Sequence, residues 1–351
     1  MHAYPFPPRG LSAIVAYLRF LRCAGVPTTL VVPECHADVP DCANGHVRAG
    51  GLIRLEARFL LHALRELSRR RRHEDVCVYI LGSMYLASIL LAYARLRRVP
   101  AAYDLRSGPI GHRPFVNPIL GLCERLSLLA AQTRIVISRE AIGWALGRRY
   151  VRGAVEIPSG AAIRCEARGT SPSDPERVRC VCISSVDRYR GWQGVLDAFR
   201  GLEGFTLDLY GWGEAFTEMT DAARGLDNVR VLGYRPFEEL QALLPGYDCG
   251  VSYIPREPYF ERQPPLKTIE YLSAGVPVVG TATAGNRLYV NDANGILCDE
   301  TSGAALRAAL LRFRESRFDR ARVQASILRF TWDSLLRHAV PRVARRMRRA
   351  S

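Results

Sequence analysis

Lysine is nearly absent from this sequence of 351 residues, because only Lys267 among the 49 basic residues is a lysine. The patterns H-E-x-x-H, C-x-x-C and D-x-D are also missing, so the sequence predicts no metal site. The ten cysteines are scattered along a long chain without paired spacing, which argues against a disulfide scaffold and predicts reduced thiols in the cytosol. The start, MHAYPFPPRG, has no charged segment followed by an apolar one, so we expect no signal peptide.

A long uncharged run occurs once, at residues 76–94, and it has two interpretations. Its 19 residues, VCVYILGSMYLASILLAYA, could cross a bilayer as a helix. Alternatively, Gly82 and Ser83 divide it into a buried strand and a buried helix. We favour the second interpretation, because similar strand–turn–helix units recur along the chain.

Positive charge is concentrated in the first half of the chain. Residues 1–165 carry 23 Arg against 11 acidic residues, whereas residues 166–351 carry 26 basic residues against 23 acidic ones. Arg-rich clusters lie at residues 69–73 and 337–350. Such clusters suit nucleic acid or an anionic membrane surface, and solvated helix faces are the plain alternative. No motif combining aromatic and basic residues supports nucleic acid, so we expect no nucleic-acid partner.

Short β-branched runs alternate with amphipathic segments throughout, which predicts an α/β protein with parallel sheets covered by helices. A chain of this length is expected to form two domains. We predict one doubly wound domain at residues 1–160, a Pro- and Gly-rich linker at 161–177 and a second doubly wound domain at 178–331. A last helix is expected at 332–351, and the sequence leaves open whether it packs back on the first domain. The predicted strands are residues 29–32, 76–81, 101–104, 134–137, 154–157, 178–184, 206–210, 229–232, 249–254, 276–280 and 295–298.

The start of the first domain departs from the usual pattern. A Pro- and Gly-rich loop stands where a Rossmann-like domain has its first strand. Either this sheet lacks its first strand or the chain begins downstream of the natural start, and the sequence leaves both open.

The single lysine falls at the start of a predicted helix, residues 265–274. Pro265 can open a helix, because the first turn leaves its N–H groups unpaired anyway. Gly275 ends the helix and Pro277 prevents its continuation.

A cation in the first turn of a helix is unfavourable by itself, because the dipole there favours an anion. A phosphate beside Lys267 would reverse that effect. Glu270 lies about one turn further on the same face, where its carboxylate could accept hydrogen bonds from hydroxyl groups of a ligand. The alternative is a plain surface ion pair between the two side chains.

Several segments now carry a family resemblance. PPLKTIEYLSAGVPVVGT, residues 264–281, resembles the donor-binding segment of glycosyltransferase family 4, the retaining sugar-nucleotide transferases with two Rossmann-like domains facing across a cleft (the GT-B architecture, "glycosyl transferases group 1"). Residues 209–214, LYGWGE, resemble the glycine loop of that family, and residues 228–255 resemble the strand, helix and strand that lead into the donor segment. The likeness covers most of residues 100–300 and is strongest in the second half.

The resemblance implies roles for particular residues. Lys267 would hold the donor diphosphate, Glu270 the ribose hydroxyls, and Arg190 a phosphate at the position where the family often has the lysine of Lys-Gly. Asp104 follows a strand at a place where related enzymes have a cleft-facing His or Asp, so it is a catalytic or acceptor candidate; a helix cap or an ion pair with Arg106 is the alternative.

Further donor contacts are implied by the same resemblance. The loop 233–235 would lie against the base, and the loop 261–263 would approach the transferred sugar and the phosphates. The full set of donor-binding candidates is Gly10, Gly211, Gly213, Gly233, Tyr234, Arg235, Glu261, Arg262, Gln263, Pro265, Leu266 and Thr268.

The sequence also departs from the family pattern. Eight positions before Glu270, where many members have a second glutamate, it has Arg262, and Ser185 replaces the arginine that usually precedes Lys-Gly. These changes bear more on the sugar contacts than on the diphosphate site.

Taken with the resemblance, the sequence predicts a metal-independent, retaining hexosyltransferase. The donor would be a UDP- or GDP-sugar, with no other cofactor, and the acceptor a glycan or lipid-linked glycan in cell-surface polysaccharide biosynthesis. The basic first half predicts a cytoplasmic protein that binds an anionic membrane surface peripherally. Two rival functions remain open, a sugar-nucleotide epimerase of the same architecture and a non-catalytic nucleotide-sugar-binding relative.

Overall fold

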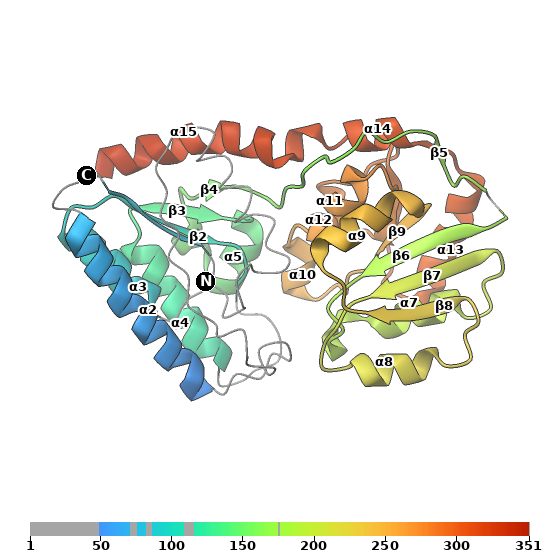
Figure 1. Ribbon diagram of the computed structural model, residues 1–351, viewed down its shortest axis with the longest axis horizontal. Helices are drawn as coiled ribbons and strands as arrows, with labels where there is room; N and C mark the ends of the chain where they lie inside the picture. Colours follow the sequence, from blue (N-terminus) through green and yellow to red (C-terminus); the bar gives the residue numbers. More distant parts are fainter. Residues whose placement is uncertain (1–48, 71–75, 82–85, 109–115, 175, 351) are drawn as a thin grey trace. The chain divides into compact units, whose positions relative to one another are not determined.

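The structure, a computed structural model, describes residues 49–70, 76–81, 86–108, 116–174 and 176–350. The chain divides into two compact units, Met1–Pro158 with Leu335–Ser351, and Ser159–Ser334. Each unit is a Rossmann-like α/β domain (Figure 1). The predicted domain limits at residues 160 and 332 differ from the limits of the units by two and three residues.

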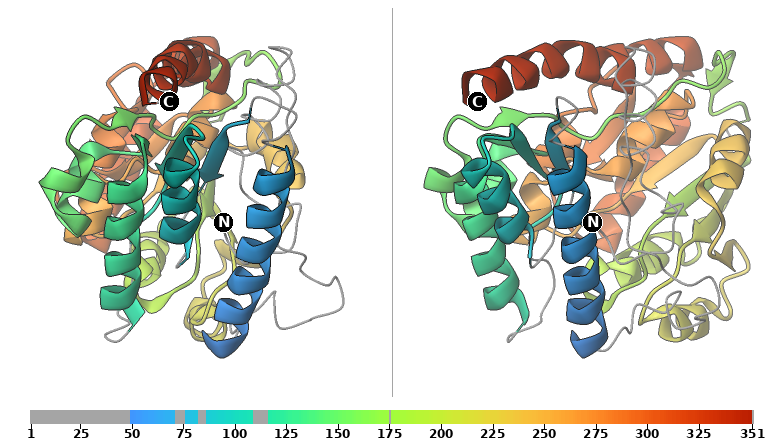
Figure 2. Two further views of the ribbon diagram at one scale, coloured as in Figure 1. Left: turned by 90° about the vertical axis from the view of Figure 1, so that its left-hand side faces the viewer. Right: turned by 60° about the vertical axis from the view of Figure 1, so that its left-hand side comes forward.

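The first unit contains a parallel sheet with the strand order β1-β2-β3-β4. Its helices α2, α3 and α4 lie side by side in that order (Figure 2). The strands are β1 Val78–Leu81, β2 Ala101–Leu105, β3 Thr133–Val136 and β4 Val155–Glu156. The helices are α2 Ala49–Arg70, α3 Ala87–Leu96, α4 Val116–Ala130, α5 Arg139–Leu146, α6 Arg148–Val151 and, from Leu335 on, α15 Trp332–Ala350.

The core of the first unit forms between its sheet and its helices. Tyr103 and Leu105 of β2 and Leu91 of α3 are fully buried, as is Leu128 of α4. A strand that is buried on both sides, such as β2, is expected in a parallel sheet with both faces covered. The uncharged run of residues 76–94 therefore contributes strand β1 and helix α3, as the favoured interpretation predicted. Among the described residues, no helix is both long enough and apolar enough to span a membrane.

The second unit contains a six-stranded parallel sheet with the order β11-β10-β9-β6-β7-β8. Its strands are β6 Val178–Ile183, β7 Phe205–Tyr210, β8 Val229–Gly233, β9 Cys249–Ser252, β10 Val278–Thr281 and β11 Gly295–Cys298. Its helices are η2 Arg188–Arg190, α7 Trp192–Phe199, α8 Phe216–Ala223, α9 Phe237–Leu243, η3 Leu244–Gly246, α10 Pro258–Arg262, α11 Leu266–Ser273, α12 Ala284–Arg287, α13 Gly303–Glu315, α14 Arg320–Ala325 and η4 Leu328–Phe330.

Two predictions about secondary structure are wrong. The predicted linker contains a short strand, β5 (Thr170–Ser171), which pairs antiparallel with β12 (Phe318–Asp319). A two-residue strand leaves no periodic pattern to recognise. The predicted loop at residues 261–263 is largely helix α10, which Pro258 opens in its first turn. The expected strand at 29–32, and the question of a missing first strand, lie outside the described residues.

Candidate functional site

The carboxyl ends of the strands of the second unit bring together most of the predicted site. In its sheet, the chain runs from β6 outward through β7 and β8, then returns to place β9 on the other side of β6. The order of strands therefore reverses between β6 and β9. Ligands of open α/β sheets bind at the carboxyl ends of the strands, where such a reversal leaves a crevice.

Lys267 lies at this reversal, in the first turn of α11. Its Nζ donates a hydrogen bond to the backbone oxygen of Tyr253, directly after β9, at 3.1 Å. Burial is the main cause that lowers the pKa of Lys267; the Cys182 thiol on β6 acts to raise it, and the positive charge of Arg190 to lower it. The ammonium is thus a desolvated cation with a second cation nearby.

Arg190 comes from the other side of the reversal, at the end of η2 after β6. Its guanidinium lies over the ring of Phe260, 4.4 Å from the centroid, and the Tyr189 ring is 5.7 Å away. Within the described residues its Nε has no hydrogen-bond partner, and Oδ2 of Asp187 is 4.0 Å from it. Burial lowers the pKa of Arg190, against the effects of Tyr189, Asp187 and Tyr259. Two partly desolvated cations that lie close enough to influence each other are groups that an anion could bind.

Glu270 adds an acceptor one turn along α11. The residue is 6% exposed, and in the described part of the chain its Oε1 has no hydrogen-bond partner. Burial raises the pKa of Glu270 to about 8, with Arg164 acting in the opposite direction. A buried carboxyl oxygen without a partner is costly, so its presence points to a ligand that donates to it. The alternative of a plain surface ion pair between Lys267 and Glu270 is not the arrangement found, because both side chains are largely buried and Nζ of Lys267 bonds to the Tyr253 oxygen.

A buried polar network fixes α11 against the sheet. The Thr268 hydroxyl donates to Oδ1 of Asn286 at 2.7 Å and lies 2.7 Å from the Ser252 hydroxyl. Nδ2 of Asn286 donates in turn to the backbone oxygens of Ser252 and Thr281 at 3.1 and 2.8 Å. Thr268 is therefore a residue that holds the helix start in place, and its hydroxyl faces the protein interior.

Two glycine loops at the ends of β6, β7 and β8 pack closely together. A Cβ on Gly211, whose φ is +156°, would lie 1.8 Å from the Ser184 oxygen, and one on Gly213 would lie 2.3 Å from the Val186 oxygen. The N–H of Gly211 donates to the oxygen of Gly233 at 2.9 Å. Only glycine permits this approach of backbones, so these predicted residues shape the rim of the site.

The residues predicted to lie against a base are on the surface at the same sheet edge. Tyr234 is 47% exposed, and Trp212, in the loop after β7, is equally exposed and contacts Phe216. Arg235 is also exposed and pairs with Glu239 at 3.3 Å, within one helical turn. An exposed pair of this kind contributes little to stability.

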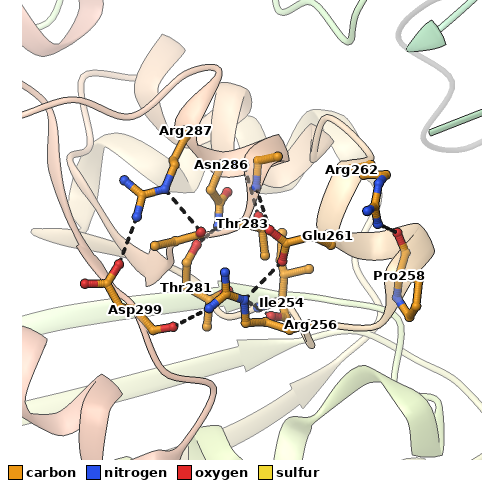
Figure 3. A network of polar contacts seen from close by, with 12 residues as sticks. Ile254, Arg256, Pro258, Glu261, Arg262, Thr281, Thr283, Asn286, Arg287 and Asp299 are labelled. Carbon is orange, nitrogen blue, oxygen red and sulfur yellow. Dashed lines mark hydrogen bonds and ion pairs between the residues drawn. The ribbon is translucent and has the colours of Figure 1, made fainter. Parts of the chain in front are cut away.

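Glu261 is occupied by structural contacts (Figure 3). Its Oε1 accepts a hydrogen bond from the N–H of Ala284 at the start of α12, at 3.2 Å, and its Oε2 accepts from Nε of Arg256 at 3.2 Å. Arg262 donates to the oxygen of Pro258 at 2.6 Å, within α10. Gln263 ends α10, and its backbone oxygen packs against Gly285 of α12.

Pro265 and Leu266 define the start of α11. Pro265 is the N-cap, with extended φ and ψ of −79° and 128°, and Leu266 is the first helical residue. Gly275, at φ +70°, follows the helix end. The helix thus has the predicted limits to within one residue at each end.

Asp104 belongs to the first unit and is fully buried. Its Oδ2 accepts hydrogen bonds from Nη2 of Arg106 at 2.9 Å and from the Tyr79 hydroxyl at 2.6 Å. Arg106 also donates to the backbone oxygen of Ile157 at 2.7 Å. The structure therefore contains the ion pair that was the alternative to a catalytic role. Gly10 lies outside the described residues.

Sequence reasoning missed several residues of the site. Asn286, Ser252, Tyr253 and Phe260 contact Lys267, Thr268 or Arg190, but they come from separate strands and helices, and only the tertiary structure brings them together. A possible signal was the aromatic pair beside Pro258, since aromatic rings often accompany arginine. Across the described residues, no group of three or more His, Cys, Asp or Glu side chains could hold a metal ion.

Part of the chain matches a known protein family. Residues 177–316, which include Lys267, Glu270 and Arg190, match the protein family described as "Glycosyl transferases group 1". A search of curated proteins finds no match.

Several solved structures have a similar fold. The lipopolysaccharide outer core galactosyltransferase WaaB in its apo form is 14% identical, with a TM-score of 0.59 and 82% of each chain covered. HepE of Anabaena, in complex with UDP, is 17% identical, with a TM-score of 0.59, covering 94% of this chain and 89% of that one. The α,α-trehalose 6-phosphate synthase of Burkholderia multivorans is 14% identical, with a TM-score of 0.60, covering 87% and 79%.

At these identities the likeness defines the fold. The chain has the two Rossmann-like domains of GT-B glycosyltransferases, and its second domain carries the glycosyl transferases group 1 match.

Proposed function

We propose that this protein is a retaining hexosyltransferase that moves a sugar from a nucleotide diphosphate sugar to a glycan or lipid-linked acceptor. The observation that carries the proposal is the pair of desolvated cations, Lys267 and Arg190, where the strand order reverses. One turn along α11, Oε1 of Glu270 has no hydrogen-bond partner in the part of the chain that the structure describes. The family match over residues 177–316 supports the same class of reaction.

The residues suit the chemistry of the donor. Cleavage of the bond between the anomeric carbon and the phosphate oxygen leaves both bonding electrons on the nucleotide diphosphate, whose negative charge grows. Lys267, Arg190 and the N-terminus of α11 are fixed positive groups that would stabilise this charge in a site of low dielectric. We propose that they do so without a metal ion.

The proposed transfer also accounts for the new bond and for the proton of the acceptor. The acceptor hydroxyl forms the new bond to the anomeric carbon from the face that the phosphate leaves, which retains configuration, and its proton passes to the departing phosphate oxygen. Glu270 would accept hydrogen bonds from the ribose hydroxyls and so hold the donor, which makes it a binding residue. Because HepE is a structure in complex with UDP, UDP-sugars are the first donors to test, and GDP-sugars the second.

The biological setting is part of the proposal. A lipid-linked acceptor would place the protein at the cytoplasmic face of a membrane, in the synthesis of a cell-surface polysaccharide. The excess of Arg in residues 1–165 supports an anionic surface as partner.

A calorimetric titration with UDP and GDP tests the site. We expect Lys267→Met and Arg190→Met to lose most of the affinity of the unchanged protein. Arg188→Met is the matched control, because Arg188 lies in the same short helix but is exposed and pairs with Glu218. Equal affinity in all four proteins would refute the diphosphate site.

A turnover assay separates the proposed reaction from its rivals. A transferase releases nucleoside diphosphate only when an acceptor is added. An epimerase would instead convert the donor sugar without releasing diphosphate, and a non-catalytic relative would bind the nucleotide without either change.

A further inference from the structure

Helix α4 of the first unit has an exposed face that is entirely apolar. Its exposed residues are Pro118, Ile119, Leu122, Leu126 and Leu129. The four larger side chains are between 45% and 58% exposed, and their spacing of three, four and three residues places them in one stripe along the helix. The only acidic residue of α4, Glu124, is fully buried.

Such a stripe is unusual on a surface helix, whose outer face is normally polar. A row of exposed apolar side chains marks a surface that contacts something else. Nothing in the site of the second unit requires this face, so its occupant is a separate question.

The surroundings of the stripe are basic. Helices α5 and α6 contact α4. Arg148 and Arg149 of α6 are exposed, and so is Arg152, the residue that follows this helix. Trp144 of α5 is 53% exposed. In residues 86–108 and 116–158, seven arginines are exposed, Arg95, Arg97, Arg98, Arg139, Arg148, Arg149 and Arg152, against only two exposed acids, Glu140 and Glu156.

Charge decides between the two simplest occupants. A second copy of this chain would bring one arginine-rich surface against another, which is repulsive. The stripe from Ile119 to Leu129 is also only about 15 Å long, and four half-exposed side chains fall short of the roughly 1,200 Å² that a stable dimer buries. An anionic lipid surface has the opposite charge and an apolar interior, so it complements both features.

We propose that the exposed stripe of α4, with the arginines around it, is a docking surface for an anionic membrane. The apolar side chains enter the boundary between headgroups and acyl chains, and the arginines contact the lipid phosphates. The proposal builds on the membrane partner proposed above but does not depend on sugar transfer, because vesicle binding is measured without donor or acceptor.

The test is sedimentation of the full chain with vesicles of phosphatidylcholine, with and without phosphatidylglycerol. We expect binding to the vesicles that contain phosphatidylglycerol, and an affinity about tenfold lower for the variant Leu122→Gln/Leu126→Gln. The matched control is Leu243→Gln/Leu328→Gln, which removes two equally exposed leucines from the second unit and should leave binding unchanged. Both pairs are exposed, so each variant should keep the melting temperature of the unchanged protein.

Three results would overturn the proposal. They are the absence of binding by the unchanged protein, equal affinity of the two variants, and a dimer in solution that Leu122→Gln/Leu126→Gln converts to a monomer. UDP titration of the same variants separates this proposal from the proposed function. If Leu122→Gln/Leu126→Gln loses vesicle binding but keeps its UDP affinity, the docking surface is supported. If the unchanged protein does not bind UDP at all, the proposed function fails, but the docking surface is not affected.

Discussion

Lys267 donates a hydrogen bond from its Nζ to the backbone oxygen of Tyr253, at 3.1 Å. This bond joins the start of α11 to the end of β9, directly beside the point where the strand order reverses. A single neutral carbonyl is a weak partner for a desolvated ammonium. An anion bound beside Lys267, as proposed, would be a stronger partner, and this proposal has measurable consequences.

Replacing Lys267 with Met should weaken UDP binding by about 10- to 100-fold, because a hydrogen bond to a charged group contributes roughly 1.5–3 kcal/mol. Met keeps most of the length of the side chain and removes a desolvated charge, so the free energy of unfolding should stay the same or rise. Calorimetry and urea unfolding measure the two effects. A variant that lost UDP binding only because it unfolded would contradict this expectation.

Nucleotide binding should also be linked to proton uptake at alkaline pH. Burial lowers the pKa of Lys267, and a bound diphosphate would raise it again. Between these two values, binding draws a proton from the buffer. Calorimetry in the alkaline range below the ordinary lysine pKa of about 10.4, in buffers of different ionisation enthalpy, should detect the uptake. The uptake should be absent in Lys267→Met and present in Arg188→Met.

Glu270 should make stability depend on pH in a particular direction. Its pKa is raised to about 8 in the folded protein from an ordinary value of 4.5, so between these values the folded state holds more protons than the unfolded state. The free energy of unfolding should therefore fall as the pH rises through this window, by up to about 1.4 kcal/mol per pH unit.

Glu270→Gln should remove that part of the pH dependence. Urea unfolding from pH 5 to pH 8 measures it. Glu261→Gln is the control, because it removes a carboxyl whose two oxygens have partners, Arg256 and the N–H of Ala284. Glu270 is still present in this variant, so the part of the slope that Glu270 causes should remain. The same slope in both variants would show that Glu270 titrates normally.

Thr268→Val should destabilise the second unit by about 1–3 kcal/mol, because it leaves Oδ1 of Asn286 and the Ser252 hydroxyl with fewer partners in a buried place. Thr220→Val is the matched control. The Thr220 hydroxyl only bonds to the oxygen of Phe216 in its own helix and is partly exposed, so this change should cost less than about 0.5 kcal/mol. Comparable losses in both variants would argue against a special role for the network.

Gly211→Ala should disrupt the loop after β7, because the new Cβ would collide with the Ser184 oxygen. We expect a clear loss of melting temperature and of UDP affinity. Gly225→Ala also changes a glycine with positive φ, but it meets nothing within 4 Å, so only the cost of the conformation, about 1 kcal/mol, should appear. Thermal unfolding with and without UDP compares them.

Local patterns in the sequence predicted most of the fold and part of the candidate site. The ten strand predictions that fall on described residues correspond to β1–β4 and β6–β11, because buried parallel strands are continuous apolar runs that periodicity detects. The helix of Lys267 was predictable to one residue, since Pro265 and Gly275 mark its ends. Helix α10, the β5–β12 pair and the contacts of Glu261 were not, because each depends on a partner remote in sequence.

The sequence by itself determined the two α/β domains, the helix that carries Lys267 and Glu270, and the basic character of the first half. These follow from periodicity, helix-ending residues and charge, which act locally. Only the tertiary structure decided that Arg190 lies close enough to Lys267 to lower its pKa, and that Oε1 of Glu270 is buried without a partner among the described residues. It also decided that Asp104 pairs with Arg106 and that α4 exposes an apolar stripe. Burial and the meeting of distant side chains depend on how strands and helices pack, and no local pattern contains that information.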